Sequence, residues 1–428
     1  MRSKSTWKSV VIWSIISAAF IGPGTVTTAV SAGSLFQLDL MWAVAFSTLA
    51  CVVLQEVAAR ITIASGLNLG QALTQRFGIR VGRYLQWFIG GSVIGGCAAY
   101  EAGNIVGAVA GAELMTGINI IVLTIALTVL SAVVLWNDNP SWISNLMTFL
   151  VALMGIAFFA LASTQRFPVG YVLSSTFVPS VPDGSELTIL GLIGTTVVPY
   201  NIFLGSGIAK GQTIPLMRIG LAISILIGGL ITAAILIAGT AITDFSSFQG
   251  LYADLEVKVG TAGAIALALG LFGAGFSSAI TSPYASAIIV RTVFDERREK
   301  VVRMVWSAVL LTGFIIGISG LKPIPVILFV QALNGLILPF LVIFLILVVN
   351  DPNVMPRTFM PGWLYNILLL AMLSGIVMIS LNNINKSVIA ALGLTPSVHF
   401  ALITTVSILV TVATALILIG RRRRAKAG

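Results

Sequence analysis

Gly22-Pro23-Gly24-Thr25 interrupts the first apolar segment of the chain, and Val198-Pro199-Tyr200-Asn201 interrupts the sixth. Proline removes a backbone donor and clashes with the preceding helical turn, and glycine raises the cost of a helical backbone further. Neither stretch can therefore continue a regular helix. A broken helix at membrane depth persists only where protein or a water-filled cavity covers its unpaired backbone groups. Two such breaks in corresponding halves predict a secondary transporter with its site near the midplane of the membrane.

The composition places the whole chain in a membrane. Of its 428 residues, 57% are hydrophobic and 9% are charged, and the mean hydropathy is +1.05. These values exclude a soluble globular domain. A helix needs about 20 residues to cross a bilayer, so we expect an all-α membrane protein with twelve transmembrane helices. The twelve apolar segments lie near 9–36, 40–64, 83–111, 117–136, 141–163, 187–209, 215–243, 259–290, 301–320, 323–349, 362–381 and 399–420.

Basic residues are distributed unevenly among the loops between these segments. With the N-terminus in the cytoplasm, 20 of the 24 lysines and arginines fall on the cytoplasmic side, and the exceptions are Arg166, Lys258, Lys322 and Lys386. Because cytoplasmic loops are enriched in basic residues, we expect a multi-pass protein of the plasma membrane with both termini in the cytoplasm. We interpret the basic run at 421–424 as a membrane anchor, and we expect no binding to nucleic acid.

The sequence shows no pattern that is typical of an enzyme. It has no Gly-Lys-Ser/Thr phosphate-binding motif, so ATP is not expected to drive it. One histidine and two cysteines are too few for a metal cluster. The basic start and the apolar run after it resemble a secretory signal, but eleven further spans follow. We therefore expect no catalytic residues, no cofactor and no metal site of the transition-metal type.

Both breaks offer unpaired backbone groups to a small charged solute. The half-helix before a break ends in free carbonyls, which suit a cation, and the half-helix after it begins with free amides, which suit an anion. A proline kink that serves only packing is the alternative for either break. The predicted substrate-binding residues are Gly22, Pro23, Gly24, Thr25, Thr28, Thr195, Val198, Pro199, Tyr200 and Asn201.

Two other segments carry polar side chains that could bind a coupling ion. In the third segment, Glu101 and Asn104 are three residues apart and share a helix face. An ionisable residue inside a span is a candidate functional residue, although a glutamate that serves only packing is the alternative. In the eighth segment, Ser277, Ser278 and Thr281 provide hydroxyls that could face an ion or simply join two helices.

Several stretches together resemble the Nramp family of divalent-metal transporters. They are Gly22-Pro23-Gly24-Thr25 with Ala32-Gly33, Leu54-Gln55 with Ala58-Ala59-Arg60, residues 194–201 with Leu204, and residues 275–284. The resemblance implies a LeuT-type fold, in which two inverted five-helix repeats have broken first and sixth helices. It places the repeats at 9–163 and 187–349 and two additional helices at 362–420, all within one transporter domain, 1–428.

The metal-binding residues of that family are not carried over. Nramp metal transporters place Asp-Pro-Gly-Asn in the first segment, where this chain has Gly22 for the aspartate and Thr25 for the asparagine. The family's methionine in the sixth segment is Val198 here, and histidines implicated in proton coupling fall on Tyr200 and Gly205. Carboxylates hold desolvated divalent cations and a thioether selects soft metals. In this chain the two breaks have neither the carboxylate nor the thioether.

Without this negative charge, the breaks offer helix amides and hydroxyls, which suit a small oxygen-rich anion. The pattern is similar to a divergent Nramp-related branch proposed to move bicarbonate with sodium. We therefore expect sodium-coupled bicarbonate uptake by alternating access, with sodium as the coupling ion. One sodium would also cancel the cost of moving an anion into a negative-inside cell.

Three other functions stay open. The chain could move a divalent cation such as manganese or magnesium, partly hydrated and with or without proton coupling, because magnesium keeps its water readily. It could be a transport-dead receptor or partner subunit, although two broken helices would have little use there. It could also carry a neutral solute such as an amino acid. No obligate protein partner is evident, and the expected partners are a small inorganic ion and the lipid bilayer.

Overall fold

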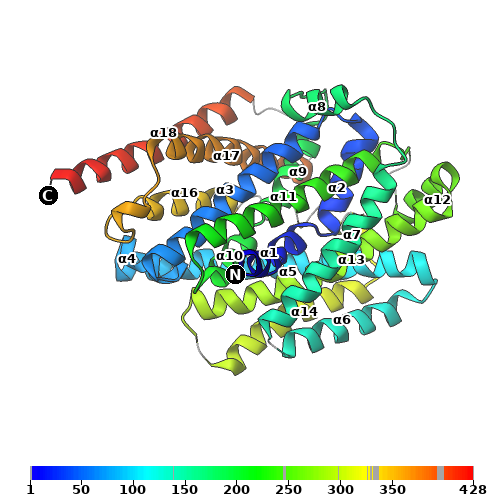
Figure 1. Ribbon diagram of the computed structural model, residues 1–428, viewed down its shortest axis with the longest axis horizontal. Coiled ribbons are helices and arrows are strands. Elements are labelled where there is room, and N and C mark those ends of the chain that lie inside the picture. The colour runs from blue at the N-terminus through cyan, green and yellow to red at the C-terminus, as the bar shows by residue number, and fades with distance from the viewer. Residues whose placement is uncertain are drawn as a thin grey trace.

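The computed structural model describes residues 2–137, 139–243, 247–296, 298–324, 326–327, 330, 337–392 and 400–427. These ranges form an all-helical bundle without strands (Figure 1). The helices are α1 (Arg2–Phe20), α2 (Pro23–Phe36), α3 (Met41–Ser65), α4 (Leu69–Phe77), α5 (Ile79–Thr116), α6 (Ile120–Trp136), α7 (Pro140–Ala162), α8 (Val169–Phe177), α9 (Glu186–Thr196), α10 (Pro199–Ala209), α11 (Ile214–Gly239), α12 (Phe248–Val259), α13 (Thr261–Thr292), α14 (Glu299–Ile318), α16 (Leu338–Val349), η1 (Arg357–Phe359), α17 (Trp363–Leu392) and α18 (Phe400–Ala427).

The described helices correspond to the twelve predicted spans. Among the described residues, nine helical segments are long and apolar enough to cross a membrane, and α9 and α10 together form one of them. Helices α1 and α2, which meet at a bend, together are long and apolar enough to form a tenth span. Two shorter apolar helices, α6 and α16, coincide with the fourth and tenth predicted segments. Part of the tenth segment, before α16, lies outside the described residues. The exact bounds of the two repeats stay a prediction.

The first break lies where the sequence predicts it but is shorter. Helix α1 ends at Phe20, α2 begins at Pro23, and the two helices meet at a bend of 64°. Gly22 is extended there, with φ −95° and ψ −179°. The helix resumes at Pro23 because a first helical position needs no backbone donor and proline already has a helical φ. Thr25 therefore lies in the first turn of α2, not in the break.

The second break is milder than the first. Helix α9 ends at Thr196 and α10 begins at Pro199, with Val198 extended as the residue before the helix. The two halves nevertheless run on as one apolar span, Thr188–Ala209. Tyr200 and Asn201 lie in the first turn of α10 and are fully buried. Their side chains are thus held by a helix at the level of the break.

Helix α5 lies directly beside the first break because glycines let the backbones approach. A β-carbon on Gly107 would lie 2.3 Å from Cγ of Pro23, and one on Gly275 of α13 would lie 2.3 Å from the backbone nitrogen of Ala108. Helices α5 and α13 pack along each other more extensively than any other described pair. These contacts bring α5, α13 and the α1–α2 break together inside the bundle.

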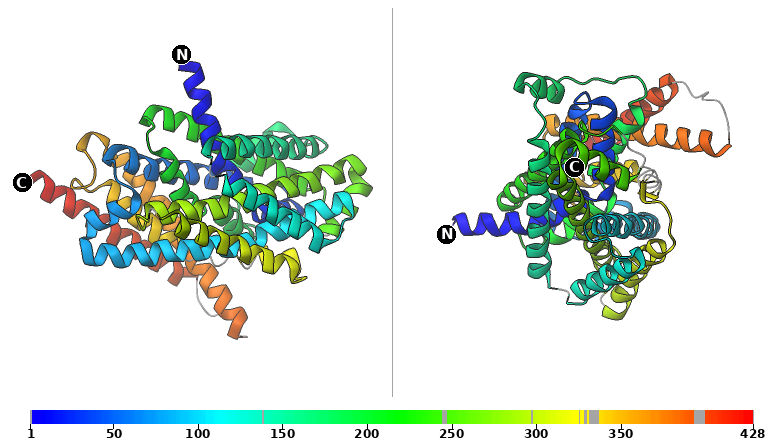
Figure 2. Two further views of the ribbon diagram at one scale, coloured as in Figure 1. Left: turned by 90° about the horizontal axis from the view of Figure 1, so that it is seen from below. Right: turned by 90° about the vertical axis from the view of Figure 1, so that its right-hand side faces the viewer.

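Other helices cover this centre. Helices α17 and α18 pair with each other along one side of the bundle, and α6 and α14 cover the opposite side (Figure 1). The first turns of α1 project beyond the bundle (Figure 2), where Trp7 is exposed. The short helix α4 follows α3 on the side that carries most of the basic residues, which we call the basic face. Asn68 accepts a hydrogen bond from the Gln71 amide at its start, as expected for a capped surface helix.

Substituting glycines of α5 and α13 should have opposite effects on stability. Gly275→Ala places a methyl group against the Ala108 backbone and should lower the melting temperature, since overpacking costs about 1–3 kcal/mol. Gly91→Ala adds a methyl group with no neighbour within 4 Å and should leave the temperature unchanged or raise it, because alanine favours a helix by about 0.5–1 kcal/mol over glycine. Thermal unfolding in detergent measures both. Equal effects would contradict the close approach of α5 and α13.

Candidate functional site

The end of α1 presents backbone carbonyls to the break, and each accepts a hydrogen bond from a hydroxyl outside α1. Ala18 accepts from Ser277 at 3.2 Å and Ser278 at 3.3 Å, Ala19 accepts from Tyr200 at 2.9 Å, and Phe20 accepts from Thr25. Helices α2, α10 and α13 thereby satisfy the groups that the break leaves unpaired. In this conformation the site is closed around the end of α1.

These contacts account for most of the hydroxyls that the sequence singled out. Thr195 donates within its own helix to the Leu192 carbonyl at 3.2 Å, and the Thr281 hydroxyl lies 3.4 Å from the Ser278 carbonyl. The Thr28 methyl group packs against Gly191, where an added β-carbon would lie 2.7 Å from that methyl group. A hydroxyl has a single proton, so a hydroxyl that already donates to a carbonyl cannot also donate to an anion.

A second group of polar side chains surrounds Gly22. Glu101 of α5 is fully buried, and the Asn104 amide nitrogen lies 3.4 Å from its Oε2 atom. A β-carbon on Gly22 would lie 2.9 Å from the Ser278 hydroxyl and 3.6 Å from the Asn104 Oδ1 atom. We call Gly22, Glu101, Asn104 and Ser278 the Gly22 cluster. The structure thus brings together residues that the sequence assigned to separate sites.

Local sequence explains how α5 presents these groups. Glu101 and Asn104 are three residues apart and lie on one face of the helix. A β-carbon on Gly313 of α14 would lie 2.8 Å from Cγ of Glu101, so this glycine lets α14 close over the carboxylate. The Glu101 Oε1 atom has no hydrogen-bond partner among the described residues. An oxygen without a hydrogen-bond partner on a buried carboxylate is unusual, and it can accept a further ligand.

Other buried polar atoms near the breaks also lack a partner within the described ranges. They are the amide oxygen and nitrogen of Asn201, the hydroxyls of Thr27 and Tyr100, and Oε1 of Gln55. The rings of Tyr100 and Tyr200 meet edge to face with centroids 5.5 Å apart. Asn201 belongs to the predicted set. Tyr100 and Gln55 do not, because nothing in an apolar helix pattern indicates which polar side chain will face a break.

No cluster of acidic, histidine and cysteine residues large enough to hold a metal by itself occurs among the residues described. A cation in this region would meet oxygen atoms from one carboxylate, amides and hydroxyls. Cys51 and Cys97 are free and buried, as expected of cysteines that pack as small apolar residues.

A cavity approaches this region from the basic face. It has a volume of about 370 Å³ and is lined by residues of α1, α7, α10 and α13, among them Ile15, Ser144, Gly207 and Tyr284. Ile15 precedes Ala18 by one helical turn, and Tyr284 follows Thr281 by the same spacing. The cavity therefore ends about one turn from the carbonyls and hydroxyls at the first break.

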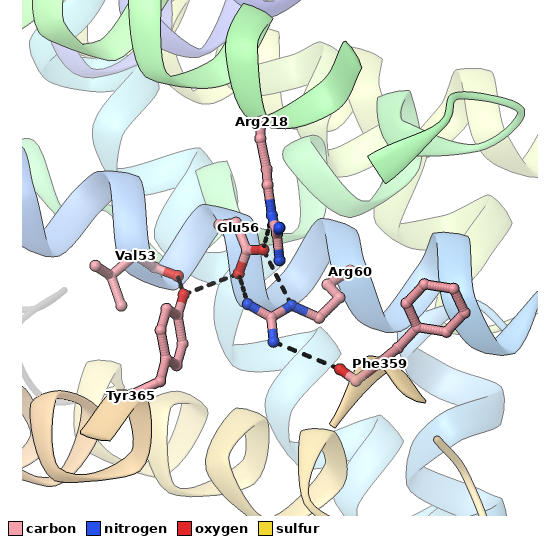
Figure 3. A network of polar contacts seen from close by, with 6 residues as sticks. All are labelled: Val53, Glu56, Arg60, Arg218, Phe359 and Tyr365. Atoms are coloured by element: carbon pink, nitrogen blue, oxygen red, sulfur yellow. Dashed lines mark hydrogen bonds and ion pairs between the residues drawn. The ribbon is translucent and has the colours of Figure 1, made fainter. Parts of the chain in front are cut away.

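A buried ion-pair network closes the basic face beside α3 (Figure 3). The Arg60 guanidinium contacts both carboxylate oxygens of Glu56 at 2.5–3.0 Å, and their four-residue spacing places both side chains on one face of α3. Arg218 of α11 donates to Glu56 at 2.8 Å, and the Tyr365 hydroxyl of α17 donates to it at 2.8 Å. One carboxylate thus joins three helices that are distant in sequence.

Comparison with known proteins decides the family. A family model described as "Natural resistance-associated macrophage protein-like", or Nramp, matches residues 14–386. The chain belongs to the Nramp family. Among its Nramp relatives, the protein named "Divalent metal cation transporter MntH" of a Nostoc species is 26% identical over 415 residues, covering 89% of this chain and 92% of the relative. The MntH protein of Erwinia tasmaniensis is 24% identical, covering 80% and 85% of the two chains.

Solved structures confirm the LeuT-type fold. A mutant of the Eremococcus coleocola manganese transporter aligns with a TM-score of 0.76 at 19% identity, covering 97% of this chain and 94% of that one. Mhp1, a nucleobase-cation-symport-1 family transporter, aligns with a TM-score of 0.59 at 15% identity, covering 98% and 93%. At these identities the likeness shows the fold alone.

The expectation of sodium-coupled bicarbonate transport is wrong, because the relatives of this Nramp protein are named as divalent metal cation transporters. The structure shows why the sequence misled. The Thr25, Thr195 and Tyr200 hydroxyls already donate to backbone carbonyls, so they are not free to bind an anion. An acidic side chain is also not absent from the region, because Glu101 lies beside the break in space although it is distant in sequence.

Removing the Glu56 carboxylate should destabilise the protein more than removing one of its partners. Glu56→Gln leaves the buried Arg60 without its charge partner, and breaking a buried ion pair costs about 3–5 kcal/mol. Arg218→Gln should cost under about 1 kcal/mol, since the Arg218 side chain is 53% exposed. Melting temperatures in detergent compare the two variants. A larger drop for Arg218→Gln would contradict the assignment of Glu56 as the centre of the network.

Proposed function

We propose that this protein is a secondary transporter that moves a divalent metal cation, manganese or magnesium, across the cell membrane. The relatives named as divalent metal cation transporters support this proposal. The observation that carries it is the buried Glu101 carboxylate, which has an unpaired oxygen and lies in the Gly22 cluster beside the first break. A transported cation would lie between Glu101, Asn104 and Ser278.

Charge is the main argument for a cation at this place. A charged group inside a membrane is costly unless a partner compensates it. The neighbours of Glu101 on α5, Tyr100 and Asn104, are neutral, and on α14 Gly313 packs against its side chain. A divalent cation would supply the missing positive charge and bind the unpaired oxygen at the same time.

The types of ligand favour a hard cation. Carboxylate, amide and hydroxyl oxygens suit magnesium and manganese, whereas a thioether would suit softer metals. This chain has Val198 where the family resemblance expects a methionine, so the site offers no thioether there. Few protein ligands are within reach of the cluster, and we therefore propose that the cation keeps part of its water shell, as magnesium commonly does.

The carboxylate also compensates for the residue missing from the first helix. The resemblance expects an aspartate at the position of Gly22, on the break itself. Here Gly22 packs closely against Ser278 and Asn104, and the acidic side chain comes from Glu101 on the adjacent helix. We propose that the acidic ligand has moved from the broken helix to α5 while the site has stayed at the break.

The cavity on the basic face suggests where the cation leaves. It ends about one turn from the end of α1, and the positive-inside rule places this face in the cytoplasm. We propose that both termini lie in the cytoplasm and that the cation reaches the cytoplasm through this cavity. The two half-helices can move about their breaks, as expected of alternating access in this class of fold.

A pair of substitutions in α5 tests the role of Glu101. Glu101→Gln keeps the shape of the side chain but removes its charge, and should reduce manganese influx into proteoliposomes by at least about tenfold, the size of effect typical for groups that support metal sites. Manganese binding to the purified variant, measured by calorimetry, should weaken in parallel. Influx is followed with a metal-sensitive dye inside the vesicles, and magnesium is assayed in the same way.

Glu113→Gln is the matched control because Glu113 is the other acidic residue of α5 and lies outside the Gly22 cluster. It should transport at the unsubstituted rate. Unchanged influx in Glu101→Gln, or an equal loss in Glu113→Gln, would contradict the proposed site. Absence of both manganese and magnesium influx in the unsubstituted protein would contradict the proposed function.

A further inference from the structure

A second cavity on the basic face is unrelated to the transport site. It has a volume of about 740 Å³ and lies between α4, the first turns of α5 and the segment that follows α13. Its lining combines amide, charged and aromatic side chains: Gln71, Arg83, Gln86, Trp87, Phe294 and Asp295. A cavity of this size with charged and amide side chains in its lining can hold a small charged group.

Close backbone contacts hold the walls of this cavity in place. A β-carbon on Gly70 of α4 would lie 2.3 Å from the carbonyl oxygen of Val293, and one on Gly82 of α5 would lie 2.5 Å from Cα of Thr74. The rings of Trp87 and Phe294 also pack together, with centroids 4.7 Å apart. The three walls are therefore packed against each other without a ligand, and the cavity is preformed.

The cavity contains two opposite charges that do not pair with each other. Neither Arg83 nor Asp295 forms an ion pair within the described residues, although both line the cavity. Charged groups nearby have other partners, since Arg76 pairs with Asp351 and Arg298 pairs with Glu296. The cavity thus offers a guanidinium and a carboxylate at separate positions, which suits a ligand that itself carries both charges.

The position of the cavity suggests where such a ligand comes from. Tyr84, Trp87 and Phe88 follow Arg83 on α5, and their side chains are 78%, 65% and 56% exposed. Exposed tyrosine and tryptophan side chains at the end of a membrane helix mark the level of the lipid headgroups. The cavity therefore opens at the height of the headgroups on the basic face.

We propose that this cavity binds the headgroup of a zwitterionic phospholipid of the phosphatidylethanolamine type. The lipid phosphate lies beside the Arg83 guanidinium, which matches phosphate geometry, and the ammonium group lies beside the Asp295 carboxylate. The acyl chains then pass along the exposed aromatic side chains of α5. A purely anionic headgroup fits less well, because part of it would face Asp295.

Lipid competition tests the proposal on the full-length protein. The unsubstituted protein is placed in mixed micelles of phosphatidylethanolamine and phosphatidylglycerol with identical acyl chains, and retained lipid is measured by native mass spectrometry. Phosphatidylethanolamine should be retained preferentially. Arg83→Gln should reduce retention of both lipids by about two- to fivefold, the range expected for partly exposed charge pairs.

Asp295→Asn should act differently and remove the preference. The backbone of Asp295 has a positive φ of 52°. Asparagine also tolerates this conformation, so the loop conformation should persist. Loss of the carboxylate should leave the two lipids bound about equally or favour phosphatidylglycerol. Arg80→Gln is the matched control, because Arg80 is an exposed arginine one turn earlier in α5 that does not line the cavity. It should retain both lipids as the unsubstituted protein does.

Three results would overturn the proposal. They are an absence of retained lipid in the unsubstituted protein, an equal loss in Arg80→Gln and Arg83→Gln, and an unchanged lipid preference in Asp295→Asn. A preference for phosphatidylglycerol in the unsubstituted protein would likewise overturn it and indicate a general attraction of anionic lipid to the basic face. The measurement needs no transported cation, so its outcome is independent of the proposed transport function.

Discussion

The unpaired backbone groups at the end of α1 are the constraint on which the centre of this protein depends. A helix that stops inside a membrane leaves carbonyls with no water to bind, and each one costs several kcal/mol if it stays unpaired. Hydroxyls of α2, α10 and α13 meet this need by donating to the last residues of α1. The break is therefore stable only because three other helices deliver donors to it.

The same convergence places a carboxylate beside the break. Gly107 and Gly275 let α5 approach α2 and α13, and this approach sets Asn104 close to Gly22, with Glu101 three residues before it on the same helix. A buried carboxyl group with an unpaired oxygen is unfavourable by itself. The structure thus combines polar side chains packed around the broken helix with an unpaired carboxylate oxygen on its neighbour. The proposed divalent cation would satisfy both.

The basic face shows a different use of charge. Glu56 and Asp351 are buried carboxylates that each bind at least one arginine from another helix, so these ion pairs hold helices together. Arg83 and Asp295 share a cavity without pairing within the described residues. Arginines that face solvent or lipid on this side also orient the protein in the membrane. Similar residues therefore serve structure in one place and are available to a ligand in another.

The sequence by itself determined the membrane class, the twelve spans, the two helix breaks and the Nramp family. These features depend on composition, on the length of apolar runs and on Gly-Pro-Gly and Val-Pro-Tyr, whose backbone preferences act locally. The pairing of Glu56 with Arg60 was also predictable, because four residues in a helix place two side chains on one face.

Only the tertiary structure decided what surrounds the breaks. Which hydroxyls are already used as donors, and whether a carboxylate lies near Gly22, depend on contacts between helices separated by tens to hundreds of residues. A search along the sequence finds no acid at positions 22–25 and predicts an anion. In three dimensions, glycine contacts bring Glu101 to the same place, because helix packing brings together side chains that no local pattern connects.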